Sequence, residues 1–193
     1  SGTGSSVNLA VPTNTTGTFD YQLVGVQESS GTACSSVASG MATVIVNALP
    51  TATISGSTNI CQNATKPLIV FSGSGGTAPY TFSYRIGSGA IQTISTLSGN
   101  TVSVEVPTNN SGTFVYTLID VQDAGGGCLN ATSGSATVVI NPQPIKAIIS
   151  AVTTHLCNGL KGVIRIDNYQ AGLSYTWYKD GLPFRTTSTD TLQ

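Results

Sequence analysis

Short runs in which apolar and polar residues alternate fill the middle of the chain. In residues 102–106 (VSVEV) the period is two, so the three valines share one face of a strand and Ser103 and Glu105 lie on the other. Turn residues separate such runs, as at the three glycines of residues 125–127. The predicted strands are residues 51–55, 67–72, 80–86, 90–95, 101–106, 113–121 and 135–141.

The same pattern occurs more than once along the chain. Val7 corresponds to Val102, 95 residues later, and Cys34 corresponds to Cys128, 94 residues later, because one residue is lost between them. Residues 52–55 and 80–82 recur in the same way as residues 147–150 and 175–177. The chain therefore spans tandem modules: residues 1–49 are the second half of one, 50–143 form a complete one, and 144–193 are the first half of a further one.

Seven short strands in each module of about 95 residues predict an all-β fold of tandem immunoglobulin-like β-sandwiches. We expect Phe82, Phe114 and Tyr116 to mark the core of the middle module, and Trp177 to occupy the position of Phe82 in the last segment. Half a sandwich cannot bury its inner face, so each outer half is expected to need further chain or a partner strand.

Two short segments with proline, residues 47–50 and 141–144, separate the modules. Linkers of this length and stiffness are expected to hold neighbouring modules end to end, as in a rod.

The composition indicates an extracellular setting. The 193 residues include 7 basic and 8 acidic side chains, so 8% are charged, where about 25% is usual in a soluble domain. This balance lacks the basic patch that nucleic acid requires. No apolar run approaches the roughly 20 residues of a membrane span. A surface of hydroxyl and amide groups is typical of bacterial exoproteins.

Several motifs resemble a known family. They are residues 60–63 (ICQN), 74–82 (SGGTAPYTF), 106–109 (VPTN), 112–114 (GTF) and 134–138 (GSATV). The chain resembles the immunoglobulin-like tandem repeats of Bacteroidota cell-surface adhesins, of which the SprB-type gliding adhesin repeats are an example. The resemblance covers the middle module and the first half-module, whereas residues 174–181 (SYTWYKDG) are similar to a different immunoglobulin-like subtype.

This resemblance implies a place of action and a set of partners. Such proteins are exported by the type IX secretion machinery and displayed on the exterior of the outer membrane. They act in surface attachment and in gliding motility. The implied partners are surface polymers, glycans or other cells, reached through the parent protein, together with neighbouring repeats of the same chain.

The cysteines Cys34, Cys61, Cys128 and Cys157 are disulfide candidates, because thiols oxidise outside the cell. One pairing joins Cys61 to Cys128 inside the module and would contribute about 4 kcal/mol by closing a long loop. The other joins each cysteine of a bottom loop to the top loop of the next module, across the joint, so that none of the four pairs with another of the four. It holds if the two loops lie at opposite poles, since a disulfide needs Cα atoms within about 7 Å. Paired ligand spacing for zinc is missing.

Other chemistry is sparse. His155 is the only histidine and no Gly-x-Ser-x-Gly motif occurs, so no catalytic residue is expected and we do not expect an enzyme. The glycine-rich residues 73–76 lack the Gly-Lys-Ser/Thr of a phosphate loop. Asp120 and Asp123 are interpreted as solvated loop acids, because calcium requires about 6 to 8 oxygen ligands. No metal or cofactor is expected.

The aromatic residues Tyr175, Trp177 and Tyr178 could form a glycan-stacking platform. Alternation instead places Tyr175 and Trp177 together on one face, which favours a core position for these two rings.

Three functions fit this sequence. The expected one is a structural repeat segment of a large secreted adhesin, acting as a rod-like stalk for surface attachment or gliding. The alternatives are accessory immunoglobulin-like or glycan-binding modules of a secreted multidomain enzyme, and a self-assembling surface filament subunit. A filament would complete its half-modules by sharing strands between subunits.

Overall fold

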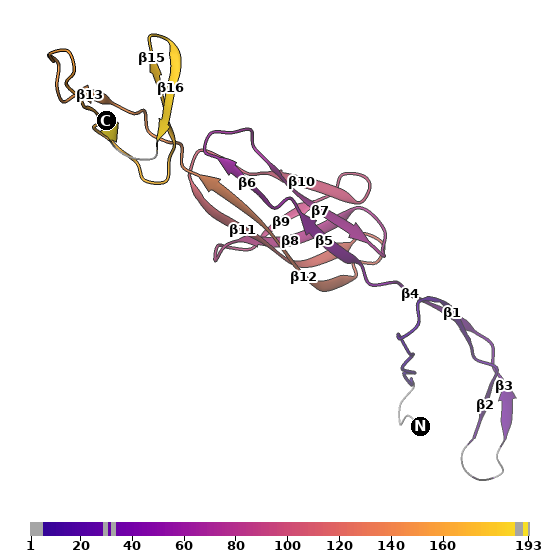
Figure 1. Ribbon diagram of the computed structural model, residues 1–193. Helices are drawn as coiled ribbons and strands as arrows, with labels where there is room; N and C mark the ends of the chain where they lie inside the picture. The colour runs from indigo at the N-terminus through magenta and orange to yellow at the C-terminus, as the bar shows by residue number, and fades with distance from the viewer. Residues whose placement is uncertain (1–5, 29–30, 32–33, 188–190, 193) are drawn as a thin grey trace. The chain divides into compact units, whose positions relative to one another are not determined.

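The computed structural model describes residues 6–28, 31, 34–187 and 191–192 (Figure 1). Every regular element in this part of the chain is a β-strand, which confirms the all-β prediction. No helix long and apolar enough to cross a membrane is found in the residues so described. The chain divides into two compact units, the first ending at Asn141 and the second beginning at Pro142.

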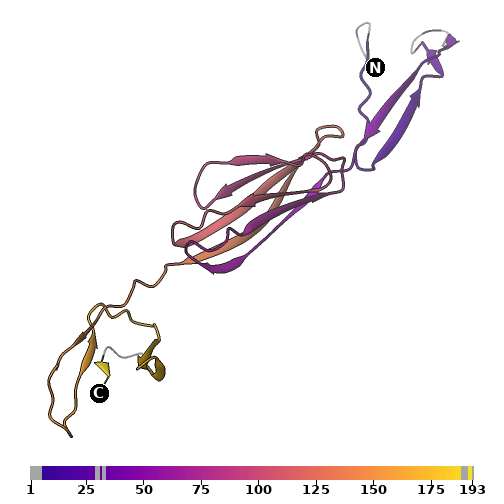
Figure 2. The same cartoon turned by 90° about the horizontal axis from the view of Figure 1, so that it is seen from above.

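Residues 51–141 form two facing sheets, whose strands run side by side in both ribbon views (Figures 1 and 2). The smaller sheet has the order β10-β7-β5, and the larger has the order β6-β12-β11-β8-β9. The strands are β5 (Thr51–Ser55), β6 (Thr58–Cys61), β7 (Leu68–Ser74), β8 (Tyr80–Ile86), β9 (Gln92–Ser95), β10 (Thr101–Glu105), β11 (Gly112–Asp123) and β12 (Leu129–Asn141).

All seven strands predicted for this module are present, but the sequence pattern missed β6. Gly56 has a φ of 114°, which only glycine adopts readily, and the chain crosses there from the smaller sheet to the larger one. β6 then runs parallel to the end of β12. A strand of four residues behind a crossover is too short for alternation to reveal it.

Alternating side chains from both sheets form the core of this module. Phe71 of β7 stacks on Phe82 of β8 with ring centroids 5.7 Å apart, and also contacts Tyr84. Phe82 and Tyr116 are fully buried, whereas Phe114 is half-buried against the same cluster. The other buried members are Ile69, Tyr80, Val106, Leu118, Val121, Ala136, Val138 and Ile140.

The N-terminal segment repeats the strand pairing of the middle module. β1 (Gly17–Gln22) pairs with β4 (Met41–Val46), and β2 (Gly25–Gln27) pairs with β3 (Ser35–Val37). Phe19 lies opposite Val44, as Phe114 lies opposite Val138 between β11 and β12. The sequence repeat is thus also a repeat of strand register.

The second unit repeats the first strands of the module. β13 (Ile149–Ala151) pairs with β14 (Ile164–Ile166), and Ile149 lies opposite Ile166 as Ile54 lies opposite Phe71. β14 also pairs with β17 (Thr191–Leu192). β15 (Tyr175–Lys179) and β16 (Leu182–Thr187) form a hairpin that differs from the hairpin of β8 and β9 in the middle module. The chain turns tightly between β15 and β16 at Asp180 and Gly181, both of which have a positive φ.

Candidate functional site

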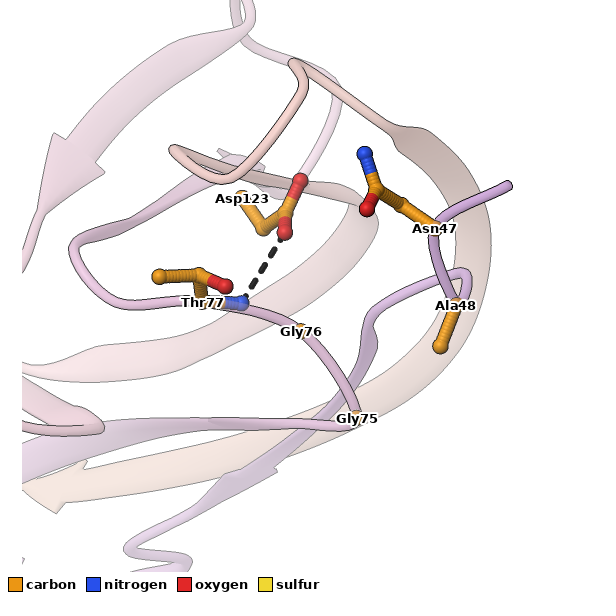
Figure 3. Close-up of a pocket in the computed structure, with 6 residues that line it drawn as sticks. All are labelled: Asn47, Ala48, Gly75, Gly76, Thr77 and Asp123. Carbon is orange, nitrogen blue, oxygen red and sulfur yellow. Dashed lines mark hydrogen bonds between the residues drawn. The ribbon is translucent and has the colours of Figure 1, made fainter. Parts of the chain in front are cut away.

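Asp123, at the end of β11, is a buried polar group that joins two loops of the middle module (Figure 3). One carboxylate oxygen accepts a hydrogen bond from the backbone N–H of Thr77 at 2.9 Å, and the other accepts one from the N–H of Cys128 at 3.0 Å. Asp123 is only 5% exposed. The interpretation of Asp123 as a solvated loop acid is therefore wrong, because its charge is satisfied by backbone donors from two loops.

Those two loops approach so closely that a side chain is excluded at Gly76. A Cβ atom there would lie 2.8 Å from Oδ2 of Asp123. The backbone N–H of Ala124 also donates to the carbonyl of Thr77 at 3.0 Å. Glycine at residue 76 and aspartate at residue 123 together fix this pole of the module.

The linker from the preceding segment docks on the same pole. Asn47 donates its side-chain amide to the carbonyl of Gly125 at 3.0 Å, and Asn130 donates to the carbonyl of Pro50 at 2.8 Å. A hollow of about 370 Å³ opens between linker and loops, lined by Asn47, Ala48, Gly75, Gly76, Thr77 and Asp123 (Figure 3). Asp123 is the only ionisable member of this lining, and both its oxygens already accept hydrogen bonds. The geometry suits the anchoring of a linker.

Cys61 and Cys128 lie at opposite poles of the module. Cys61 ends β6 opposite Asn141, the last residue of β12, whereas Cys128 directly precedes Leu129, the first residue of β12. β12 has 13 residues. At about 3.3 Å for each residue, the two cysteines are on the order of 40 Å apart. A disulfide between them is therefore incompatible with this fold.

No disulfide joins any of the four cysteines, all of which lie in the described part of the chain. Cys61 and Cys157 are exposed, and Cys128 is half-buried. The pairing across a joint thus stays a prediction.

The three aromatic residues of the last segment do not form one platform. Trp177 is 9% exposed on the inner face of β15, and its neighbour Tyr178 is exposed. The hydroxyl of Tyr175 accepts a hydrogen bond from the N–H of Gln170 at 2.8 Å. A single flat ring surface for a sugar is therefore missing from these three residues.

A surface network that the sequence did not reveal surrounds Asp167. Its Oδ1 atom accepts hydrogen bonds from the hydroxyl of Ser150 and from Nε of Arg165, both at 2.9 Å. The hydrogen bond from Ser150, followed by that from Arg165, holds the pKa of Asp167 below its ordinary value. The two partners belong to β13 and β14, so the network joins these strands.

His155 and Asp120 take no part in such an arrangement. His155 is exposed between β13 and β14. Asp120 is half-buried within β11, after the bulge that follows Leu118, so its interpretation as a solvated loop acid is wrong as well. Among residues 6–28, 31, 34–187 and 191–192, no three His, Cys, Asp or Glu side chains gather as metal ligands.

No protein-family model and no curated protein matches this chain. Its function is therefore inferred from its own repeats, its buried faces and the contacts at its poles.

Proposed function

We propose that the chain is a segment of tandem immunoglobulin-like β-sandwich modules from the stalk of a large secreted cell-surface adhesin. The observation that carries the proposal is the repeated register: β1 and β4 pair as β11 and β12 do, and β13 and β14 pair as β5 and β7 do. The order of the strands supports the immunoglobulin-like class, because β5, β7 and β10 share one sheet while β8, β11 and β12 share the other.

The linkers support a serial arrangement of modules. Asn47 and Pro50 are both tied by hydrogen bonds to the module that follows them, and their counterparts Asn141 and Pro144 stand before the last segment. Short linkers with proline limit the freedom of neighbouring modules. Such an array acts as a stalk that extends a tip, or that presents many weak contacts to surface polymers, glycans or other cells.

The low charge and the abundance of hydroxyl and amide side chains support a place outside the cell. On this proposal the parent protein leaves by the type IX machinery, stands on the exterior of the outer membrane, and serves surface attachment or gliding. The segment itself carries no catalytic role in the proposal.

The test is the size and place of the native polypeptide. An antibody raised to residues 51–143 is used on a denaturing gel of whole cells and on intact cells. We expect a very large band and labelling of the cell surface. A band of ordinary enzyme size, or label only in the medium, would contradict the stalk and favour accessory modules of a secreted enzyme.

A self-assembling surface filament is the second candidate. One observation favours it: apolar side chains of the terminal segments, such as Leu23 and Val26, are exposed although their counterparts in the middle module are buried.

A further inference from the structure

The chain enters and leaves the middle module at opposite ends of β12. Asn130, the second residue of β12, donates a hydrogen bond to the carbonyl of Pro50 at 2.8 Å, so the incoming linker lies at the start of this strand. The outgoing chain follows Asn141, the last residue of β12. Tension along a series of modules therefore pulls the incoming chain and the end of β12 in opposite directions, along the axis of this strand.

The first two strands of the module lie in the path of this tension. β5 pairs with β7, and after the crossover at Gly56 the chain continues as β6 beside β12 (Figure 1). β6 and β12 run parallel, with Thr58 opposite Val138 and Cys61 opposite Asn141. The pulled end of β6 is its first residue and the pulled end of β12 is its last. Tension therefore slides the two strands past one another.

Sliding and peeling load the hydrogen bonds of a strand pair in different ways. Sliding loads all of them at the same time, because they run from strand to strand, across the direction of pull. Peeling the strands apart from one end loads the bonds one after another. A group of bonds that must break together presents a higher barrier, and this barrier sets the lifetime of a protein under force.

Hydrogen bonds beyond the strand ladder strengthen the contact of β6 with β12. The N–H of Gln62 donates to the carbonyl of Asn141 at 2.7 Å, and the N–H of Thr137 donates to the hydroxyl of Ser57 at 3.0 Å. The side-chain amide of Asn141 also donates to Oδ1 of Asn59. The bonded positions thus extend from residue 57 to residue 62, past both ends of β6.

The segment that follows β6 is held as well. The N–H of Asn63 donates to the carbonyl of Thr108 at 2.9 Å, and the hydroxyl of Thr108 donates to the carbonyl of Ala64 at 2.8 Å. The side-chain amide of Gln62 donates to the carbonyl of Asn109 at 2.6 Å. These bonds fix the far end of β6, so that this strand cannot pivot away from β12 when it is pulled.

We propose that β6 and β12 form a mechanical clamp, whose rupture limits the unfolding of the module under tension. The clamp consists of residues 58–61 and 138–141 with the adjoining bonds of Ser57 and Gln62. Tension that frees β5 from β7 cannot lengthen the chain beyond residue 57 until β6 leaves β12. The inference rests on the serial arrangement of modules proposed above, and not on secretion or on the adhesin role.

The first experiment compares two directions of pull in single-molecule force spectroscopy of the 193-residue protein at constant force. Cys34, Cys128 and Cys157 are replaced by serine, so that Cys61 is the only thiol. One tether joins the two chain ends and slides β6 along β12. The other joins Cys61 to the C-terminal end. Cys61 is exposed and lies opposite Asn141, so this tether peels the two strands apart from their common end.

We expect the module to survive at least about tenfold longer in the tether between the chain ends than in the tether from Cys61 at the same force. The event is recognised by its length in the tether between the chain ends. Unfolding of residues 51–141 there releases on the order of 300 Å of chain, at about 3.5 Å for each residue. Equal lifetimes in the two directions of pull would overturn the proposal.

The second experiment removes one hydrogen bond of the clamp. Because the carbonyl of Asn141 accepts from Gln62, alternation along β12 directs the N–H of Val139 toward β6 and that of Ile140 toward β11. Val139→Pro removes this donor. We expect about tenfold shorter lifetimes in the tether between the chain ends.

Ser135→Pro is the matched control. Ser135 is exposed, and its N–H lies on the same side of β12 as that of Val139. It comes before Val138, where the pairing with β6 begins, so the lifetime should persist. A Val139→Pro chain that survives as long as Ser135→Pro would overturn the proposal.

A milder substitution decides the matter if Val139→Pro does not fold. Ser57→Ala removes the acceptor of the N–H of Thr137 without changing the backbone, and should shorten the lifetime about fivefold. Ser135→Ala is its control and should leave the lifetime unchanged. Equal lifetimes of these two variants would overturn the proposal.

The clamp and the stalk can fail separately. A very large, surface-labelled native polypeptide whose middle module has equal lifetimes in both directions of pull would overturn the clamp and leave the stalk standing. A native polypeptide of ordinary enzyme size whose module resists sliding as expected would contradict the stalk and support the clamp.

Discussion

At the scale of single residues, the polar groups that matter here join segments distant in sequence. Asp123 binds the backbone of residues 77 and 128, and Asn47 reaches the carbonyl of Gly125. Each of these side chains fixes the conformation of a loop, which the alternating pattern of the strands does not predict. Their loss should therefore lower the stability of a pole and leave the strand order unchanged.

Asp123→Ala should lower the free energy of unfolding of the middle module by about 3 kcal/mol. The substitution removes two charge-assisted hydrogen bonds and leaves the part-buried N–H groups of Thr77 and Cys128 without their acceptor. Urea unfolding followed by circular dichroism measures the change. Glu105→Ala is the control, because its ion pair with Lys66 at 3.1 Å is exposed and contributes less than about 1 kcal/mol. Equal effects of the two substitutions would contradict the assigned role of Asp123.

Asp167 should titrate below its ordinary value of 3.8 in the folded protein. Because its folded pKa is depressed, its contribution to stability is present above the unfolded pKa and is lost as pH falls through the folded one. A carboxyl-carbon NMR titration measures this pKa. Ser150→Ala should raise the pKa toward 3.8, since it removes the strongest of the hydrogen bonds that lower it. An unchanged pKa in this variant would assign the shift to Arg165 alone.

At the scale of elements, alternation was enough to find the strands that carry the core. Residues 80–86 were predicted to the residue because Tyr80, Phe82 and Tyr84 alternate with polar neighbours on a strand buried on one face. β6 was missed because the chain changes sheets there, and this depends on the backbone conformation of Gly56.

The role of Asp123 was missed for a related reason. Its hydrogen-bond donors are backbone N–H groups, which nearly every residue has. The residue types at these positions therefore give no sign in the sequence that they bind Asp123. The distance between Cys61 and Cys128, by contrast, follows from topology alone once β6 is placed beside the end of β12.

Gly56→Ala should lower the free energy of unfolding by about 3 kcal/mol and loosen β6. An added Cβ would collide with the carbonyl oxygen of Leu68, and the φ of 114° is unfavourable for alanine. Hydrogen exchange of the amides of β6, together with urea unfolding, reports both effects. Gly99→Ala is the matched control, because Gly99 also has a positive φ, of 72°, but no atom lies within 4 Å of the added Cβ. That variant should lose only about 1 kcal/mol; an equal loss in both would assign the effect to backbone conformation alone.

At the scale of the whole molecule, the two units differ in how much apolar surface they bury. Twelve buried residues form the core cluster of the middle module. In the described part of the second unit, the buried apolar residues are Ile166 and Trp177. A unit with so small a core is expected to be much less stable by itself.

The single tryptophan makes this difference measurable. Trp177 lies in the second unit, so its fluorescence reports that unit alone, while circular dichroism is dominated by the strands of the middle module. In the 193-residue protein, the fluorescence transition should occur at lower urea concentration than the circular dichroism transition. Phe82→Ala should then destabilise the middle module by about 3 to 5 kcal/mol and move only the second transition, because Phe82 is fully buried there. Coincident transitions, or a tryptophan signal that follows Phe82→Ala, would mean that the two units unfold as one and that the second unit draws its stability from the first.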